Sequence, residues 1–197
     1  MKLTLIRHGI TEGNAKRLYY GSTDIPLLPE SFERLRRYAE AGRYPKAERY
    51  FTSGMIRTEQ TFSAIYGDTP HEAIRDMREI DFGVFEMRPY EELKDDPEYQ
   101  KWIEGDFESN VCPGGESGVQ VTERALRAIR PLIEDGRDAV IVTHGGVIGG
   151  VLGKLFPREN ARFYYTPEPG GGFTVEFENG IPVSIMKLGP SGEQNDN

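Results

Sequence analysis

The sequence predicts an α/β fold, a three-layer α/β/α sandwich with a mostly parallel central sheet and a C-terminal hairpin. Two short apolar runs rich in β-branched residues, at 3–6 and 138–144, have the pattern of strands buried on both faces. Helical segments lie between them, and strands that alternate with helices are typical of parallel sheets. Residues 173–188 alternate apolar and polar side chains around Asn179-Gly180, which predicts a two-residue hairpin.

Three segments predict the covering helices. The first two, at 31–42 and 57–67, each end in a glycine, a frequent C-terminal helix stop. In the third, which starts at 118, apolar side chains recur every three or four residues as far as Ile133. Pro131 interrupts this pattern, so we expect the third helix to bend or end there.

The rest of the chain predicts one domain with a capping region and a tail. Residues 86–115 are charged, rich in aromatic side chains and broken by prolines, which indicates short helices and loops over the sheet. Residues 190–197 are polar and are expected to be disordered. A chain of 197 residues with 37% hydrophobic content supports one sizeable core, so we expect a single domain over 1–189.

Charge and composition exclude several classes of protein. A formal net charge of −8 argues against nucleic acid or an anionic membrane as a partner, so any basic site must be concentrated. Cys112 is the single cysteine and cannot close an intrachain disulfide, and we expect it to have no role in the chemistry. No segment approaches 18 apolar residues, and the start lacks a signal-peptide pattern. We therefore expect a cytoplasmic protein, a monomer or a homodimer.

Both apolar strands lead directly into a histidine. His8 follows the first strand with Arg7 before it, and His144 follows the second; glycines come next at Gly9 and Gly145. Ligands of α/β sheets bind at the carboxyl ends of strands, so two neighbouring strands would bring both imidazoles to one site. A guanidinium offers a planar fork to phosphate oxygens, and a neutral imidazole can attack phosphorus. This arrangement favours a phosphoryl group as the ligand.

A series of short motifs then runs through nearly the whole chain. It begins with RHGITEGN at 7–14 and continues with GSTDIPL (Gly21 and Asp24), TSGMIRTEQT (Arg57), REIDFG (Glu79), PGGES at 113–117 and THGG at 143–146. In this order the motifs resemble those of the histidine phosphatase superfamily, also called phosphoglycerate-mutase-like, whose signature is Arg-His-Gly-x-Thr-x-x-Asn.

The resemblance implies a role for each matching residue. His8 would be the nucleophile that becomes phosphohistidine, and Glu79 would protonate the leaving alcohol. Arg7, Arg57 and His144, the last as an imidazolium, would hold the phosphoryl oxygens, and Asn14, the Gly21 backbone and Gly145 would bind substrate. Fixed cations around a metaphosphate-like transition state lower the barrier without a metal, so we expect neither a metal nor a cofactor.

Two assignments stay open at this point. Asp81 or Glu86 could supply the proton in place of Glu79. PGGES could be part of the site, or it could be a turn followed by a helix N-cap at Ser117. The context of Arg57, Ser-Gly-Met-Ile-Arg, also departs from the family's usual Ser-Pro-Leu-x-Arg.

The resemblance implies a metal-independent phosphatase that acts on a small-molecule phosphomonoester. The compact chain is similar to the family's short bacterial phosphatases, including α-ribazole phosphatase, and lacks the inserted segment of the longer cofactor-dependent mutases. The alternatives are a phosphoglycerate mutase-type phosphoryl transferase and a catalytically weak module that binds a phosphorylated ligand. Where the phosphatases often have Phe-Gly-x-Trp-Glu-Gly, this chain has FGVFEM at 82–87. We expect this departure to alter the substrate specificity more than the phosphoryl-transfer chemistry.

Overall fold

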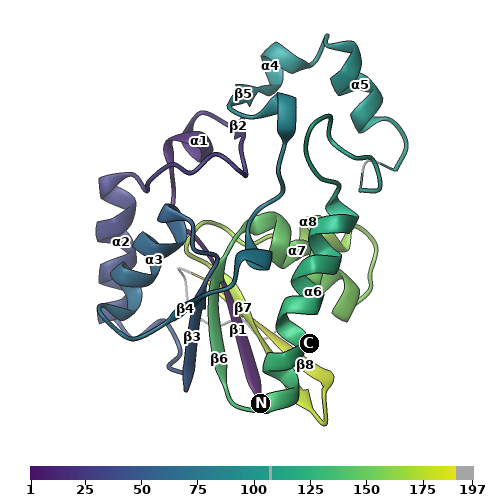
Figure 1. The fold of residues 1–197 in the computed structure, drawn as a ribbon. Coiled ribbons are helices and arrows are strands. Elements are labelled where there is room, and N and C mark those ends of the chain that lie inside the picture. The colour runs from purple at the N-terminus through teal and green to yellow at the C-terminus, as the bar shows by residue number, and fades with distance from the viewer. Residues whose placement is uncertain (107, 190–197) are drawn as a thin grey trace.

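The computed structural model describes residues 1–106 and 108–189, so the predicted disordered tail lies outside the described residues. Its centre is a six-stranded sheet in the order β4-β3-β6-β1-β7-β8 (Figure 1). Strands β4, β3, β6 and β1 pair in parallel, and β7 and β8 are antiparallel. The elements are β1 (Lys2–Arg7), α1 (Glu12–Ala15), β2 (Leu18–Tyr19), α2 (Pro29–Glu40), β3 (Arg49–Thr52), α3 (Ile56–Tyr66), β4 (Glu72–Ala73), 3-10 turns at Arg75–Met77 and Gly83–Phe85, β5 (Arg88–Pro89), α4 (Tyr90–Leu93), α5 (Pro97–Ile103), α6 (Gly118–Asp135), β6 (Ala139–Thr143), α7 (Gly145–Leu155), α8 (Ala161–Tyr164), β7 (Gly172–Glu178) and β8 (Ile181–Leu188).

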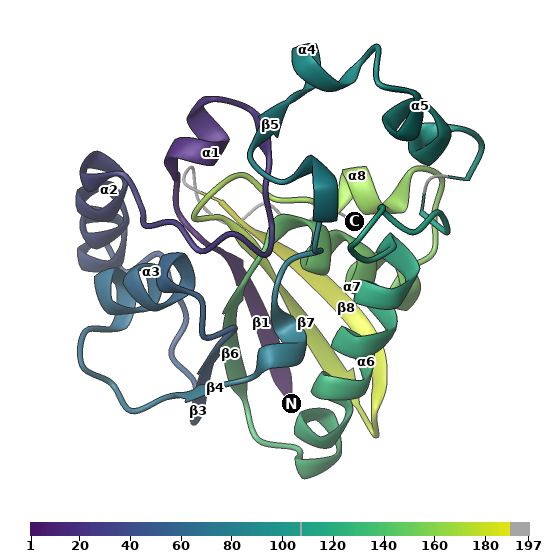
Figure 2. The ribbon, with the colours of Figure 1, turned by 45° about the horizontal axis from the view of Figure 1, so that its top comes forward.

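Helices cover both faces of the sheet, which confirms the three-layer prediction. Helices α2 and α3 lie on one side and α6 and α7 on the other (Figure 2). Leu3 and Leu5 of β1 belong to the large core formed with α6 and α7, whereas Ile6 packs with Phe62 of α3. The alternation of side chains along β1 therefore supplies both cores, as expected for a strand buried on both faces.

The hairpin and the first two helices agree with the sequence prediction. Asn179 and Gly180 have φ angles of 51° and 79°, which a two-residue turn of this kind requires. Helix α3 ends at Tyr66 with Gly67 as its C-cap, and α2 ends at Glu40, just before Gly42. The short strand β3 is absent from the sequence prediction, because its RYFT sequence is only four residues long and does not alternate clearly.

Of the two outcomes expected at Pro131, a bend or an end of the helix, the second is wrong. The helix continues to Asp135 and stops at Gly136, which adopts a left-handed conformation. Ile129 and Leu132, on either side of the proline, are buried in the large core, whereas Pro131 is exposed. The buried face therefore stabilises the helix enough to offset the missing backbone hydrogen bond.

Residues 86–106 and 108–115 lie above the carboxyl ends of the strands, where the sequence predicts a capping region, and we call them the cap (Figure 1). Tyr99, Trp102 and Cys112 of the cap form a separate small core with Phe85. Burial raises the pKa of the Cys112 thiol to about 12, so this cysteine stays protonated. Tyr19 joins the cap to the body of the protein, because its hydroxyl lies 2.6 Å from that of Tyr99. In the part of the chain that the structure describes, no helix has the length and apolar content to cross a membrane.

The cap joins the sheet through a close approach of two backbone segments. Gly83 has a φ of 49°, and a Cβ placed on it would lie 2.1 Å from the Pro113 carbonyl oxygen. The Val84 N–H also donates to this carbonyl at 3.0 Å. Only glycine fits at position 83 without moving the 113–115 turn.

Gly83→Ala should therefore lower the free energy of unfolding by about 1–3 kcal/mol more than Gly180→Ala does. Gly180 is the matched control, because its φ of 79° carries the same backbone strain while no heavy atom lies within 4 Å of its added Cβ. Urea unfolding followed by far-UV circular dichroism measures both values. Equal losses in the two variants would show that the approach to Pro113 carries no constraint.

Candidate active site

The parallel pairing of β1 with β6 brings the two strand-end histidines together. Arg7 is in register with Thr143, and the His8 N–H donates to the Thr143 carbonyl at 2.9 Å. The centroids of the His8 and His144 rings are 5.2 Å apart, with an angle of 61° between their planes. Both side chains are buried. The expectation that the imidazoles face one another across one site is confirmed.

His8 presents one unprotonated ring nitrogen. Its Nδ1 lies 2.7 Å from the Gly9 carbonyl oxygen, which only accepts, so Nδ1 carries the hydrogen. Burial lowers the pKa of His8 well below 6.5, and the positive charges of Arg57 and Arg7 lower it further. The ring is neutral near pH 7, and Nε2 keeps its lone pair.

His144 is also neutral in this structure, which differs from the imidazolium expected from the sequence. Its Nδ1 accepts a hydrogen bond from Arg57 Nε at 3.3 Å, so the ring hydrogen lies on Nε2, 2.8 Å from Ser53 Oγ. Burial lowers the pKa of His144, and the charge of Arg57 adds to this effect. Arg57 thus fixes the tautomer of His144, and Ser53 Oγ accepts the remaining ring hydrogen.

The Arg57 guanidinium lies wholly inside the protein at the start of α3. Its Nη1 donates to the Thr23 carbonyl at 3.0 Å and its Nη2 to the Gly21 carbonyl at 2.7 Å. It also stands over the Tyr20 ring, 5.1 Å from the centroid. Burial lowers the pKa of Arg57, but an arginine in a protein stays protonated. The site therefore contains a permanent buried cation beside both imidazoles.

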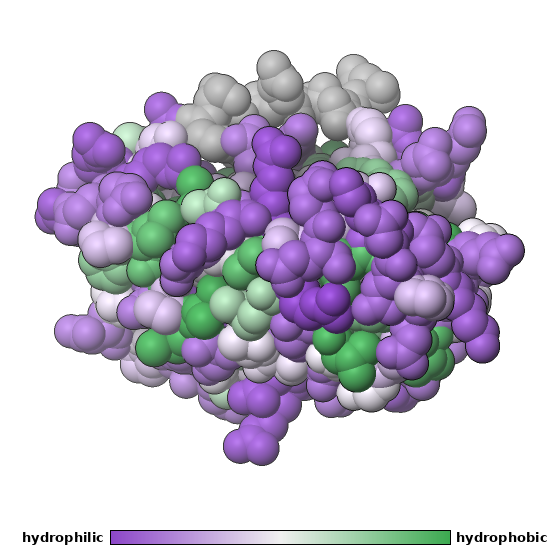
Figure 3. Space-filling view, turned by 90° about the horizontal axis from the view of Figure 1, so that it is seen from above, coloured by the Kyte–Doolittle hydropathy of each residue, from purple (hydrophilic) through white to green (hydrophobic). Residues whose placement is uncertain are grey.

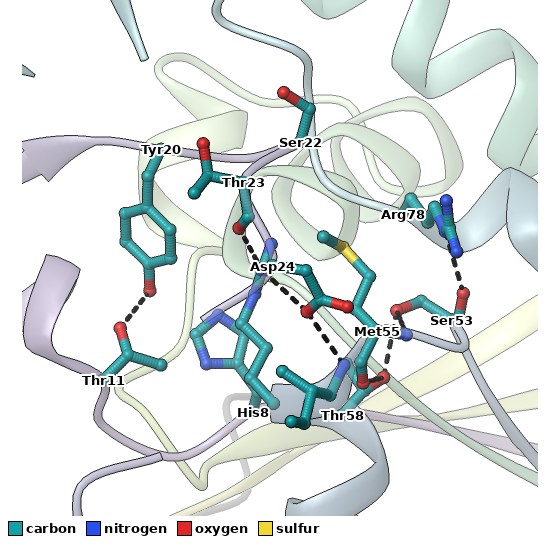
Figure 4. Close-up of polar contacts among 12 residues, drawn as sticks. His8, Thr11, Tyr20, Ser22, Thr23, Asp24, Ser53, Met55, Thr58 and Arg78 are labelled. Atoms are coloured by element: carbon teal, nitrogen blue, oxygen red, sulfur yellow. Dashed lines mark hydrogen bonds and ion pairs between the residues drawn. The ribbon is translucent and has the colours of Figure 1, made fainter. Parts of the chain in front are cut away.

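The loop that holds Arg57 is tied down at several points. The hydroxyl of Tyr20 lies 2.6 Å from Thr11 Oγ1, and Asp24 accepts from the Ile56 N–H at 2.9 Å (Figure 4). Figure 4 also shows Arg78 donating to the Ser53 carbonyl. These bonds join the loop to the start of α1 on one side and to the start of α3 on the other.

Glu86 fixes the same loop from the side of the cap. Its carboxylate accepts hydrogen bonds from the backbone N–H groups of residues 21–23 and of Phe82, at 2.9–3.1 Å. Burial acts to raise the pKa of Glu86, but these bonds and one from the Thr23 hydroxyl outweigh it, so the pKa is below its ordinary value. A carboxylate that stays ionised is a poor proton donor, which argues against Glu86 as the general acid. The Gly21 N–H donates to Glu86, and the Gly21 carbonyl accepts from Arg57. The contact of the Gly21 backbone with the site is therefore made by its carbonyl.

Arg7 has one buried donor with no acceptor. Its Nη1 donates to the Pro167 carbonyl at 2.7 Å, whereas its Nε has no hydrogen-bond partner within the described residues. Gly145 makes room for this side chain, because a Cβ on Gly145 would lie 3.1 Å from Arg7 Cζ. Arg34 and Arg49 also have a buried Nε without an acceptor, so what points to an anion at Arg7 is its place directly before His8, where an anion would also satisfy this Nε.

Glu79 lies at the start of α7, next to this cation. Its Oε2 accepts from the Gly146 N–H at 3.0 Å, and its Oε1 accepts from the N–H of Ile80 at 3.1 Å. Arg124 of α6 holds the segment, since it donates to the carbonyls of Glu79 and Arg78 at 3.0 and 2.7 Å. Glu79 is therefore a carboxyl group held in place beside the two strand ends.

The remaining candidates have structural partners. Asp81 accepts from Ser22 Oγ and from the Gly83 N–H. Asn14 Oδ1 accepts from the N–H and the hydroxyl of Thr11, both at 3.1 Å, in the capping box of α1. In PGGES, Glu116 pairs with Arg124 at 2.8 Å, and Ser117 is the N-cap of α6. The structure thus favours the turn and N-cap interpretation of PGGES.

Sequence reasoning missed two residues of the site. Ser53 stands in the Arg57 motif, so its place beside a strand end could have indicated a partner for His144. Tyr20, beneath the guanidinium, has no such signal beyond its position next to Gly21. Within residues 1–106 and 108–189, no group of three or more His, Cys, Asp or Glu side chains could hold a metal ion.

Comparison with known proteins agrees with this geometry. The family model of the histidine phosphatase superfamily (branch 1) matches residues 3–180. The chain is 30% identical over 160 residues to a probable phosphoglycerate mutase GpmB of Enterobacter sp., covering 79% of this chain and 74% of that protein. It is 28% identical over 171 residues, 84% of each chain, to an adenosylcobalamin/alpha-ribazole phosphatase of Salmonella typhimurium.

A solved structure shares the fold over the whole chain. The alpha-ribazole phosphatase from Shigella flexneri superimposes with a TM-score of 0.86 at 23% identity, covering 100% of both chains. With a family model that spans most of the sequence, the motifs and the fold lead to one conclusion: this chain belongs to the histidine phosphatase superfamily, branch 1.

Proposed function

We propose that the protein hydrolyses small-molecule phosphate monoesters through a phosphohistidine on His8. The observation that carries this proposal is the state of His8, a neutral imidazole whose Nδ1 is bonded to Gly9 and whose Nε2 is unprotonated. A nucleophile that is already deprotonated needs no separate base. The cations of Arg7 and Arg57 lie close enough to shift the pKa of His8, so a phosphoryl group on Nε2 would lie within their field.

The reaction has two steps. His8 Nε2 attacks phosphorus in line, the bond from phosphorus to the alcohol oxygen breaks, and Glu79, as a carboxylic acid, protonates the leaving oxygen. Water then attacks the phosphohistidine, Glu79 takes the proton from the water, and inorganic phosphate leaves with His8 restored. Arg7 and Arg57 stabilise the charge on the equatorial oxygens. A bound dianion would also raise the pKa of His144, which reconciles its neutral state here with a role as an imidazolium during the reaction.

The substrate belongs to the proposal. The two relatives have different named activities, one a probable phosphoglycerate mutase and the other an adenosylcobalamin/alpha-ribazole phosphatase. We favour hydrolysis, with α-ribazole phosphate among the candidate substrates. The match to the phosphatase covers 84% of both chains, whereas the match to the phosphoglycerate mutase covers 79% of this chain and 74% of that protein. A mutase is the second candidate, favoured by the similarity to the phosphoglycerate mutase. Since the mechanism uses only side chains, assays should contain EDTA.

Glu79→Gln should slow the hydrolysis of alkyl phosphates about 10²- to 10⁴-fold while slowing p-nitrophenyl phosphate far less. An alkoxide needs a proton to leave, whereas p-nitrophenolate leaves with little help. Steady-state assays on both substrates give the ratio. Asp81→Asn is the matched control, because Asp81 is a nearby carboxylate whose partners are Ser22 and Gly83. An equal loss on both substrates would assign Glu79 a positioning role only.

The free energy of unfolding should fall as the pH is lowered from 6.5 to 5.5. Both His8 and His144 have folded-state pKa values below the unfolded value near 6.5, so in this window the unfolded chain binds protons that the folded protein does not. Over this window each histidine contributes about 1 kcal/mol, because an unfolded histidine is already half protonated at pH 6.5. Urea unfolding at several pH values measures the slope, and His8→Gln should remove about half of it. A slope unchanged by His8→Gln would contradict a neutral His8.

A further inference from the structure

A largely apolar cavity of about 470 Å³ borders Glu79. Among the residues that the structure describes, six of its lining side chains are apolar or aromatic: Tyr19, Ile80, Phe82, Trp102, Ile103 and Phe163. They come from β2, the segment after Glu79, the cap and α8. Figure 3 looks onto this end of the molecule and shows hydrophobic patches between hydrophilic side chains.

The cavity borders the proposed proton donor. Both Glu79 and Gly146 line it, and the Gly146 N–H donates to Glu79 Oε2 at 3.0 Å. The oxygen that Glu79 protonates must lie within hydrogen-bond distance of that carboxyl group. An alcohol whose oxygen is at Glu79 can therefore extend its carbon skeleton into the cavity.

The aromatic wall of the cavity is held in place by contacts among its own rings and with the cap. The Tyr19 ring packs edge-on against Phe82 and Trp102, with centroids 5.4 and 5.9 Å apart. The Tyr19 hydroxyl is bonded to that of Tyr99, and Trp102 Nε1 donates to the Asn110 carbonyl at 3.2 Å. The polar ends of these rings thus have protein partners, and their faces and edges form an apolar surface.

The single cation that lines this cavity among the described residues is already paired. Arg162 Nε lies 2.5 Å from Glu108 Oε1, its Nη1 donates to the Gly146 carbonyl at 2.6 Å, and its Nη2 donates to Gly118 and Thr122. Glu79 and Glu108 add two carboxyl groups to the same lining. A carboxylate or second phosphate entering here would lose water without gaining a free cation.

A second cavity of about 430 Å³ also borders Glu79. Its charged side chains do not favour an anionic substrate either. Its arginines, Arg75, Arg78 and Arg124, are accompanied by Asp76, Asp81 and Glu116. Arg124 is committed to Glu116 and to backbone carbonyls. Neither cavity next to Glu79 has an excess of positive charge.

We propose that the alcohol part of the substrate is an uncharged aromatic group that occupies the cavity lined by Tyr19, Phe82, Trp102 and Phe163. This inference rests on the proposed phosphatase function and narrows its substrate class. It excludes phosphoglycerates as preferred substrates, because their carboxylate would lie between the paired Arg162 and two carboxyl groups.

The test compares ethyl phosphate, 2-phenylethyl phosphate and 3-phosphoglycerate. The first two release primary alcohols of similar basicity, so a difference in kcat/KM reports binding of the phenyl ring. Burial of a phenyl group predicts a kcat/KM at least about 10-fold higher for 2-phenylethyl phosphate than for ethyl phosphate. We expect 3-phosphoglycerate to be no better than ethyl phosphate.

Phe163→Ala should reduce the preference for 2-phenylethyl phosphate over ethyl phosphate about 3-fold or more, mainly through KM, and leave ethyl phosphate hydrolysis unchanged. Ile181→Ala is the matched control, because Ile181 on β8 has the same 65% exposure as Phe163 and does not line the cavity. Ile103→Ala, at the cavity rim, should act like Phe163→Ala.

A preference for 3-phosphoglycerate, or a phenyl preference that both cavity variants leave intact, would overturn the inference while the phosphatase function stood. Failure of the wild-type protein to hydrolyse any of the three esters would overturn the proposed function itself.

Discussion

The buried guanidinium of Arg57 is the constraint on which the rest of the site depends. A permanent charge inside a protein is stabilised by partners for its donors, and here the hydrogen-bond partners are Gly21, Thr23 and His144, with the Asp24 carboxylate 3.9 Å away. Two of these are backbone carbonyls of one short loop, so that loop must be held in place. Glu86 supplies the restraint from the cap by accepting the N–H groups of residues 21–23. The cap is thereby joined to the buried cation of the candidate site.

Burial and the charge of the same cation set the protonation of both histidines. Burial is the larger cause that lowers the pKa values of His8 and His144, Arg57 adds to it, and backbone and side-chain partners then select the tautomers. The hydrogen bond from His8 to Gly9 leaves Nε2 unprotonated, as the proposed nucleophile must be, while Ser53 orients His144. The site thus combines a positive field with an uncharged nucleophile, two properties that phosphoryl transfer from a dianionic ester requires. Arg7, with its unpaired Nε, adds a donor that an anion can satisfy.

The sequence predicted those features that depend on strongly patterned segments. The strands before His8 and His144 are apolar and β-branched, and the Asn179-Gly180 turn permits one hairpin geometry, so their places followed from local rules. Pro131 does not end α6, because the burial of Ile129 and Leu132 in the core outweighs the local effect of a helix breaker. The partners of the titratable groups were not predictable: Ser53 beside His144 and Glu86 beneath the 21–23 loop are contacts between segments far apart in the chain. A motif gives a residue type and an order, whereas tautomers and pKa shifts depend on packing.

The most direct test of this account is to trap the covalent intermediate. The protein is mixed with a ³²P-labelled phosphate monoester in EDTA, quenched within milliseconds under alkaline denaturing conditions that preserve phosphohistidine, and digested for peptide mapping. The account predicts label on His8 alone, lost on acid treatment, and no label in a His8→Ala variant that keeps the wild-type circular dichroism spectrum. Label on another residue, or turnover that persists in His8→Ala, would contradict it.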